Sequence, residues 1–575
     1  MILQALKEYY DRKVADPDSG IAPPGWEKKE LPFLVVLNPD GSPVGIEDTR
    51  QPEGKKLRAK AFMVPQAVKR SSGMRANLLW DDPEYTLAMD VKGDREKAIA
   101  KNNLFIERIE DEKLFEIPDV AALITFLKNP DKLESLAKIA PESIEELRLA
   151  SFISFRIAGR QEPIFRNPEI IRRLDTKTST VDGGRDLCIV SGVQDTIARL
   201  HPPIKGVRGA NTTGGNIVGF NAAAFCSFGK TQGDNAPVGE SASFAYTTAL
   251  NTLLDKDSNQ KIQVGDATVV FWSKRKTIVE DQFLAWFAEP PPDDPDRLVE
   301  AVTALYNSVE SGTFTQDGDD TGFYVLGLSP NAGRLSVRFW HVGTVADIAA
   351  NIRQYFEDLR IAHGAKDRKD LSLWRLLVST AVQGKSENIN PNLAGEVMRS
   401  ILGNLPFPET LLQAVLLRTK AERDVSYPRA KLIKGYINRK LRFNPQNNER
   451  MLTMSLDKEN PNIGYQLGRL FAVLEKIQQE AQPGINATIR DKFYASASST
   501  PSTVFGNLMR LKNHHLSKLE NPGRRIWFEK ALGEIVDSIT DFPSHLPLGD
   551  QGRFAIGYYH QVQDLWTKKS DKQNN

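Results

Sequence analysis

The spacing of apolar residues changes along the chain. Up to residue 343, short runs of β-favouring residues alternate with amphipathic stretches, and after that point every clear period is that of a helix. We therefore expect an α+β fold, in which a mixed α/β N-terminal region with short β-sheets precedes an all-α C-terminal helical bundle. The domains implied are a mixed region over 1–343, a helical connector over 344–404 and a C-terminal bundle over 405–575.

The predicted elements follow from these periods. Strands are expected at 31–37, 60–64, 152–157, 187–191 and 268–273, with Val44 and Ile46 returning after a turn as a hairpin partner of the first. Thr344 is placed to cap a helix through 361. The helices expected are 1–13, 118–128, 142–150, 240–254, 344–361, 370–383, 389–402, 408–421, 428–441, 463–480, 501–518, 523–540 and 551–568.

One hairpin is well marked in the sequence. Two β-rich runs, 323–329 and 335–342, are separated by a short segment with Pro, Asn and Gly. Strict alternation places Leu335, Val337 and Phe339 on one face of the second strand, and Arg338 and Trp340 on the other.

Composition sets limits on the class of protein. The 575 residues carry 75 Lys and Arg against 73 Asp and Glu, a net charge of +2, which excludes a generally cationic protein but leaves room for local basic patches. The two cysteines, Cys188 and Cys226, exclude a disulfide scaffold and fit a reducing compartment. With charge at Lys7 and no run of 18 apolar residues, we expect a cytoplasmic protein without a signal peptide or membrane span.

The candidates for catalysis are weak. Residues 224–231 (AFCSFGKT) fit a permissive phosphate-binding pattern, but Ala224 replaces the first glycine and two phenylalanines occupy the loop. The seven histidines form no HExxH motif, and the acidic run at 317–320 lacks the glutamate of a calcium loop. We expect no catalytic residue, no metal and no cofactor, and we keep a P-loop NTPase that uses Ala224–Thr231 as an alternative.

Basic clusters give a stronger signal. Residues 50–75 hold eight Lys and Arg against Glu53, residues 199–216 combine three cations with glycines, Asn and Thr, and residues 418–442 hold nine Lys and Arg against two acidic residues. Cations neutralise phosphates, glycine permits close approach of the backbone, and Asn and Thr hydrogen-bond phosphates or base edges. Each cluster could also be a solvated surface, so polyanion binding and this simpler interpretation both remain open.

Several long blocks carry a family resemblance. The chain resembles the large subunit of the Cascade complex of CRISPR–Cas subtype I-C, the Csd-type large-subunit family, over roughly residues 1–442. The blocks are MILQALKEYYDR, IAPPGW, VPQAVKRSSGMRANLLWDDPEY, ARLHPPIKGVRGANTTGGNIVGFNAAAFCSFGKTQGDNAPVGESASFAYTTALNTLL, FYVLGLSPNAGRLSVRFW and RAKLIKGYINRKL.

The resemblance implies a non-catalytic, DNA-reading subunit. A CRISPR RNA pairs with the target strand, while protein recognises a short flanking motif, the PAM, in duplex DNA. The implied partners are crRNA, the PAM duplex and displaced strand, the handle-binding, backbone and small subunits, and a separate helicase–nuclease. The resemblance also suggests an internal start, at Met451 or Met454, for a small helical subunit.

Two loops and one helical cluster are assigned to these roles. The residues expected to bind the PAM region are Lys69, Arg70, Ser71, Ser72, Gly73, Arg75, Asn77, Lys205, Arg208, Asn211, Thr212 and Thr213. The residues expected to bind the displaced strand or the hybrid are Arg418, Lys420, Arg423, Arg429, Lys431, Lys434, Arg439, Lys440 and Arg442. A structural scaffold whose basic faces bind RNA remains the other alternative.

Overall fold

The fold consists of two compact units, each described here by itself. The computed structural model describes residues 1–54, 56–68, 70, 73–177, 185–290, 297–311, 320–390, 392–444, 446 and 449–566. Unit 1 contains Leu3–Pro202 and Phe220–Ala249, and unit 2 contains Pro203–Gly219 and the chain from Leu250 onward. The boundaries between these units differ from the domain boundaries expected from the sequence. The expected domain boundaries remain a prediction.

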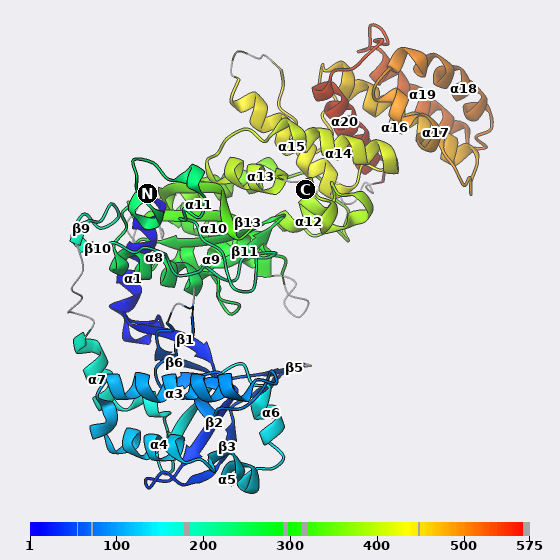
Figure 1. The fold of residues 1–575 in the computed structure, drawn as a ribbon. Helices are drawn as coiled ribbons and strands as arrows, with labels where there is room; N and C mark the ends of the chain where they lie inside the picture. Colours follow the sequence, from blue (N-terminus) through cyan, green and yellow to red (C-terminus); the bar gives the residue numbers. More distant parts are fainter. Residues whose placement is uncertain are drawn as a thin grey trace. The chain divides into compact units, whose positions relative to one another are not determined.

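Unit 1 is organised around a four-stranded sheet with the order β3-β2-β8-β7 (Figure 1). The fully buried strand β2 (Phe33–Leu37) pairs antiparallel with β3 (Pro43–Asp48) and parallel with β8 (Ile153–Ile157), and β7 (Trp80–Asp81) closes the other edge. The expected hairpin partner of 31–37 is confirmed. Three two-stranded ribbons accompany the sheet: β1 (Trp26–Glu30) with β6 (Ala61–Pro65), β4 (Gln51–Glu53) with β5 (Lys56–Arg58), and β9 (Arg185–Leu187) with β10 (Gln194–Thr196).

Helices of the connection between β2 and β8 supply the core of unit 1. Phe105 of α3 (Arg95–Asp111) and Phe126 of α4 (Pro118–Lys128) both contact the ring of Phe155, with centroid distances of 6.4 and 6.2 Å. Burying these large apolar side chains against the sheet is the main stabilising contribution here. The other helices of unit 1 are α1 (Ile2–Val14), α2 (Pro83–Leu87), α5 (Lys132–Ile139), α6 (Ile144–Arg148), α7 (Pro168–Lys177) and the part of α8 (Glu240–Leu253) up to Ala249.

One expected strand of unit 1 is wrong. The run 187–191 contributes only Leu187 to strand β9, and a turn follows in which the N–H of Gly192 donates to the carbonyl of Cys188 at 2.8 Å. Cys188 is fully buried against Val238 and Ala242. The apolar character of this run therefore reflects burial of a turn rather than a strand.

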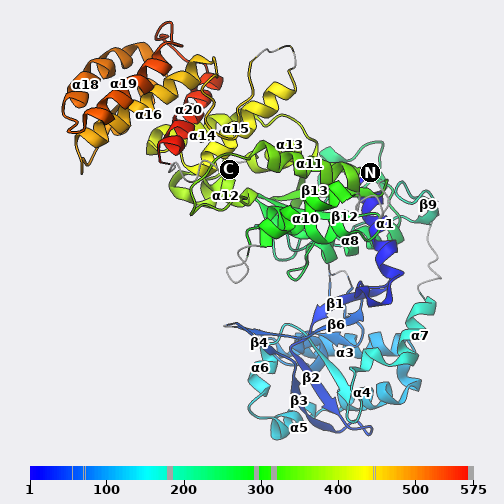
Figure 2. The same ribbon diagram turned by 180° about the vertical axis from the view of Figure 1, so that it is seen from behind.

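Unit 2 begins with an antiparallel meander, β11-β12-β13-β14 (Figures 1 and 2). The strands are β11 (Lys261–Val264), the fully buried β12 (Ala267–Ser273), β13 (Gly322–Asn331) and β14 (Arg334–Thr344). The expected hairpin is present, but a bulge shifts the register where Gly327 faces Phe339 and Leu328 faces Val337. Arg338 is the extra residue, so Leu335 and Val337 lie on the face of Leu328 and Pro330, while Phe339 lies on the opposite face with Gly327. The single apolar face expected from alternation is therefore wrong, and Phe339 is the residue that joins the core of unit 2.

Helices make up the rest of unit 2. α9 (Ile278–Phe287), α10 (Arg297–Ser311) and α11 (Val345–Asp358) contribute to the core around the sheet, and α11 begins as expected at a capping box of Thr344 with Asp347. The remaining helices are α12 (Leu373–Val378), α13 (Leu393–Leu402), α14 (Glu409–Glu422), α15 (Tyr427–Arg442), α16 (Ile463–Ala481), α17 (Ile489–Ala497), α18 (Phe505–Ser517), α19 (Pro522–Val536) and α20 (Leu548–Trp566).

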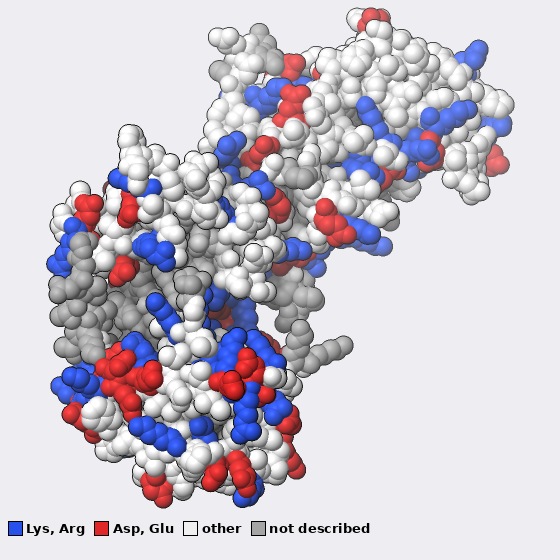
Figure 3. Space-filling model, viewed as in Figure 1, with Lys and Arg blue, Asp and Glu red and all other residues white. Residues whose placement is uncertain are grey.

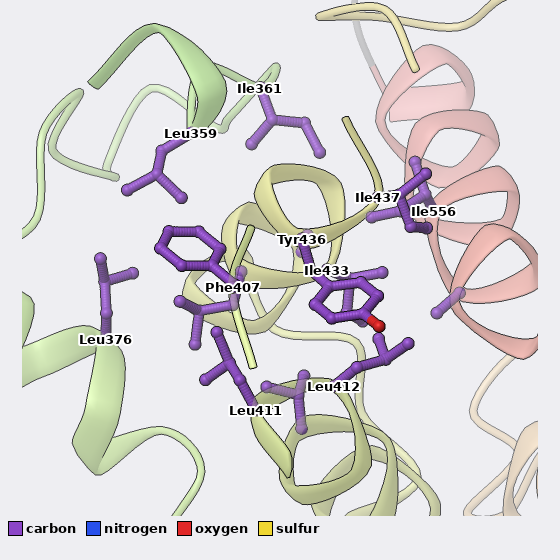
Figure 4. Close-up of a cluster of buried hydrophobic side chains, with 14 of the residues drawn as sticks. Leu359, Ile361, Leu376, Phe407, Leu411, Leu412, Ile433, Tyr436, Ile437 and Ile556 are labelled. Carbon is purple, nitrogen blue, oxygen red and sulfur yellow. The ribbon is translucent and has the colours of Figure 1, made fainter. Parts of the chain in front are cut away.

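An apolar core joins these helices. Figure 4 shows Leu411 and Leu412 of α14, Tyr436 of α15 and Ile556 of α20 converging with neighbouring apolar side chains. Helices α16 and α20 lie in close contact, because glycines stand where their backbones meet. A Cβ added to Gly468 would lie 2.0 Å from the carbonyl oxygen of Phe554, so only glycine allows this spacing.

Candidate nucleic-acid interface

The loop 203–219 is hydrogen-bonded to strand β14 in the sheet of unit 2. Ile204 and Gly215 exchange two backbone hydrogen bonds of 2.8 Å, and the N–H of Leu335 in β14 donates to the carbonyl of Asn216 at 3.0 Å. Within the loop, the N–H of Lys205 donates to Asn251 Oδ1 at 2.8 Å. The backbone of this loop is therefore held at both ends and in between.

Glycines make this close attachment possible. Gly206 and Gly214 have φ values of +85° and +95°, a region that favours glycine. A Cβ on Gly206 would lie 2.5 Å from the carbonyl oxygen of Leu254, and one on Gly214 would lie 2.8 Å from that of Ile204. The glycines of the loop thus serve its attachment to its own unit, a role that sequence reasoning did not distinguish from approach to a phosphate.

The polar side chains of this loop point outward. The side chains of Lys205 and Arg208 are exposed and form no ion pair within the described part of the chain, although the N–H of Arg208 is fixed by Thr268 Oγ1 at 3.0 Å. The other exposed residues proposed from the sequence are Asn211, Thr212 and Thr213. A fixed backbone that presents uncompensated cations and hydrogen-bonding side chains suits phosphate contact.

The second predicted loop lies in unit 1 and is built around Asp81. This carboxylate is fully buried and accepts hydrogen bonds from the N–H groups of Asn77 at 2.8 Å and Asp82 at 2.9 Å, and from the Arg70 guanidinium. Burial raises the pKa of Asp81 above its ordinary value, while these donors favour the carboxylate. Arg70 also donates to the carbonyl of Arg75 at 2.7 Å, so it stabilises the loop from within.

Asn77 does not fit its expected role as a base reader. Only 3 % of it is exposed, and its Oδ1 accepts the N–H of Val68 at 3.0 Å. Gly73, with φ +80°, and Arg75 are exposed. Lys69, Ser71 and Ser72 lie outside the described residues. The loop therefore retains Arg75 as a described surface cation, and it belongs to a different unit from loop 203–219.

The expectation for the 418–442 cluster needs a larger correction. Arg429, Lys431, Lys434 and Arg439 of α15 are each at most 5 % exposed. Arg439 donates to Asp358 at 2.9 Å and to the carbonyl of Ser400 at 2.8 Å. These four side chains cannot contact a nucleic acid in this fold, because they belong to the interior of a helical body.

The buried ammonium groups of Lys431 and Lys434 offset the partial negative charge at the C-terminal end of α11. Lys434 Nζ donates to the carbonyl of Asp358 at 3.2 Å, and Lys431 Nζ donates to the carbonyls of Leu359 at 3.3 Å and Lys369 at 2.8 Å. Carbonyls at the C-terminus of α11 carry partial negative charge, which ammonium groups offset. Burial lowers the pKa of both Lys431 and Lys434 to about 8.

The other members of the cluster differ in exposure. Arg418 is paired with Glu422 at 2.7 Å, Lys420 donates to Ser499 and Gln551, and Arg442 is paired with Asp358 at 2.6 Å. Arg423 and Lys440 are exposed. Arg423 also lines a cleft of about 740 Å³ together with Lys492 and His515. Strand binding stays a prediction for these exposed cations only.

The segment Ala224–Thr231 has a different geometry from a P-loop. A short 3-10 turn (Ala223–Phe225) precedes Phe228, which is 97 % exposed with φ +53°, and a second 3-10 turn (Gln232–Asn235) follows Lys230. A P-loop places its lysine at the start of an α-helix, whereas the next α-helix here begins at Glu240. The local arrangement therefore speaks against the NTPase alternative.

Charge and metal-ligating groups add further limits. On the face drawn in Figure 3, Lys and Arg are interspersed with Asp and Glu. Among the described residues, no group of three or more His, Cys, Asp or Glu side chains is placed to hold a metal ion. In the same part of the chain, no helix combines the length and the apolar character needed to cross a membrane.

Comparison with known proteins identifies the family. A family model described as CRISPR-associated protein (Cas_Csd1) matches residues 6–566, which is nearly the whole chain. No curated protein matches the chain significantly. The match extends beyond the resemblance noticed in the sequence and includes helices α16 to α20. The chain belongs to the CRISPR-associated Cas_Csd1 family.

Proposed function

We propose that this chain is the non-catalytic large subunit of a crRNA-guided type I-C surveillance complex and that it contacts the PAM duplex beside the target. Family membership supports a role in a CRISPR-associated complex with other Cas proteins. The observation that carries the DNA-binding part is loop 203–219, which presents exposed Lys205 and Arg208 from a fixed backbone. Phosphate contacts from such a loop provide affinity, and Asn211, Thr212 and Thr213 are within the same loop for base discrimination.

The remaining roles are proposed from the family resemblance rather than from this loop. We include in the proposal that the subunit helps open the target, forms the R-loop, stabilises the displaced strand and recruits the separate helicase–nuclease. Since four cations of the 418–442 cluster are buried, we restrict strand contact to the exposed Arg423 and Lys440.

The test uses the assembled complex with its crRNA. Target duplexes share one protospacer and carry a randomised flanking triplet, and the bound fraction is sequenced. The proposal predicts enrichment of a small set of flanks and loss of that enrichment in the Asn211→Ala/Thr212→Ala variant. Equal recovery of all flanks by the unaltered complex would instead favour the scaffold that binds RNA alone.

A further inference from the structure

A hollow in unit 2 adjoins loop 203–219. Its volume is about 390 Å³, within the range of pockets that enclose small ligands. The residues that line it come from the loop, the turn between β11 and β12, strands β13 and β14, helix α12 and the segment 386–390. A second hollow of about 240 Å³ shares Gly209 and Pro330 with the first, so the two lie side by side.

One residue that lines the larger hollow has a buried hydroxyl group without a hydrogen-bond partner among the described residues. Ser329, near the end of β13, is 1 % exposed, and its Oγ has no hydrogen-bond partner within the described residues. A buried polar group without a partner costs free energy, and Ser329 lines the hollow, so a ligand bound there is a candidate for the missing hydrogen-bond partner.

The other walls suit a nucleotide. Trp374 is 42 % exposed and lines the hollow, which offers a flat aromatic surface on which a base can stack. Arg208 and Arg338 line it too, and Arg338 is paired with Asp266 at 2.9 Å while Arg208 forms no ion pair in the described chain. Glu387 is a second carboxylate on the wall. A phosphate is therefore disfavoured near Asp266 and Glu387.

The smaller hollow fits the adjoining phosphate. It is lined by Gly209, Gly214, Gly215 and Gly333, together with Asn211 and Arg334. Walls of glycine backbone allow a phosphate to approach closely, and Arg334 supplies positive charge.

From this arrangement we propose that the two hollows, together called the trough, hold one unpaired nucleotide of a single strand, with its base stacked on Trp374 beside Ser329 and its phosphate in the glycine-lined hollow beside Arg334. This inference rests on the proposed function as a nucleic-acid-binding subunit and adds an unpaired nucleotide to its ligands. A base within a duplex is stacked on its neighbours and does not enter, so the trough selects single-stranded over double-stranded nucleic acid.

The test measures binding of a decanucleotide that carries one 2-aminopurine to the full-length chain, by quenching of its fluorescence, in DNA and RNA versions. Trp374→Ala should weaken binding about tenfold or more, and Ser329→Ala should weaken it several-fold without lowering thermal stability. The matched control is Trp527→Ala on α19, since Trp527 is also 42 % exposed, and it should bind like the unaltered chain. The preference between the DNA and RNA versions identifies which strand the trough takes.

Unchanged affinity of Trp374→Ala, or an equal loss in Trp527→Ala, would overturn the inference. The same variants are then tested on a fully paired duplex, where Trp374→Ala should have no effect. If the complex selects flanks normally and Trp374→Ala binds single strands as tightly as the unaltered chain, only the trough proposal is rejected. If the complex shows no flank selection but its single-strand binding depends on Trp374, only the proposed PAM function is rejected.

Discussion

Arg439 Nη1 donates to Asp358 Oδ2 across 2.9 Å inside the helical body of unit 2, where Arg439 is fully buried. Its other donors are used on the carbonyls of Ser400 and Leu405, and its guanidinium lies 4.7 Å from the centre of the Phe407 ring. A residue whose sequence context suggests a basic surface is thus a structural cation.

Arg439→Ala should strongly destabilise the chain, because it leaves Asp358 with a buried charge that has lost a partner. A loss of roughly 3–5 kcal/mol is expected, measured by denaturant unfolding. The neighbouring exposed Lys440 provides the control, and Lys440→Ala should stay within about 0.5 kcal/mol of the unaltered chain. Similar losses in both variants would refute the structural role of Arg439.

The Asn77→Ala substitution should lower stability rather than relax flank choice. Its buried Oδ1 holds the N–H of Val68, so about 1–3 kcal/mol is lost when that donor has no partner. Asn211→Ala, at an exposed loop position, should leave unfolding unchanged. Unfolding curves that coincide for the Asn77 variant and the unaltered chain would restore the idea that Asn77 reads bases.

Two helical glycines, one at the contact of α16 with α20 and one on the open surface of α19, are expected to respond oppositely to replacement by alanine. Gly468→Ala places a Cβ against the backbone of α20 and should cost about 1–3 kcal/mol or more, as overpacking does. Gly533→Ala, in helix α19 with open space around its Cβ, should gain up to about 1 kcal/mol from helix propensity. Thermal unfolding of both variants checks the sign of each change.

Acid should weaken the helical body through His560. Burial, with a further contribution from Lys434, lowers the pKa of His560 to about 3, and its Nδ1 lies 2.9 Å from the Tyr465 hydroxyl. The unfolded chain takes up a proton below about pH 6.5 and the folded chain does not, so stability is lost as pH falls from 6.5 towards 3, at about 1.4 kcal/mol per pH unit.

His560→Gln should remove this component of the pH dependence, whatever its effect at pH 8. His545→Gln, at an exposed position, should keep the slope of the unaltered chain. The comparison is made on free energies of unfolding between pH 4 and pH 8. A slope that survives in the His560 variant would assign the acid sensitivity to other groups.

Periodicity predicted local structure well where one face of an element is buried. The N-cap at Thr344 and the hairpin of β13 and β14 follow directly from local residue order. The bulge at Arg338 could not be predicted, since register depends on cross-strand packing rather than on alternation alone. Likewise α3, whose apolar residues are sparse, and α17, which is short, carry too little periodic signal to be recognised.

The candidate site was predicted less evenly. The segment 199–216 was recognised from its cations, glycines and amides, and Lys205, Arg208 and Asn211 are exposed in the fold. In contrast, the cations of α15 and the amide of Asn77 were expected on the surface. The sequence cannot show that Lys434 binds a buried carbonyl or that Asn77 accepts a backbone N–H. Trp374, Ser329 and Arg338 were missed as site residues because they are distant in sequence and meet only in the folded unit.

The central claim is that Lys205 and Arg208 contact phosphates of the flanking duplex, and the salt dependence of binding by the assembled complex tests it most directly. Two lost phosphate contacts should reduce the slope of log affinity against log salt by roughly 1.8 in the Lys205→Ala/Arg208→Ala variant. The control variant Arg525→Ala/Lys530→Ala removes the same charge from exposed positions of α19 and should keep the slope. An unchanged slope in the loop variant, or an equal decrease in the control, would contradict the account.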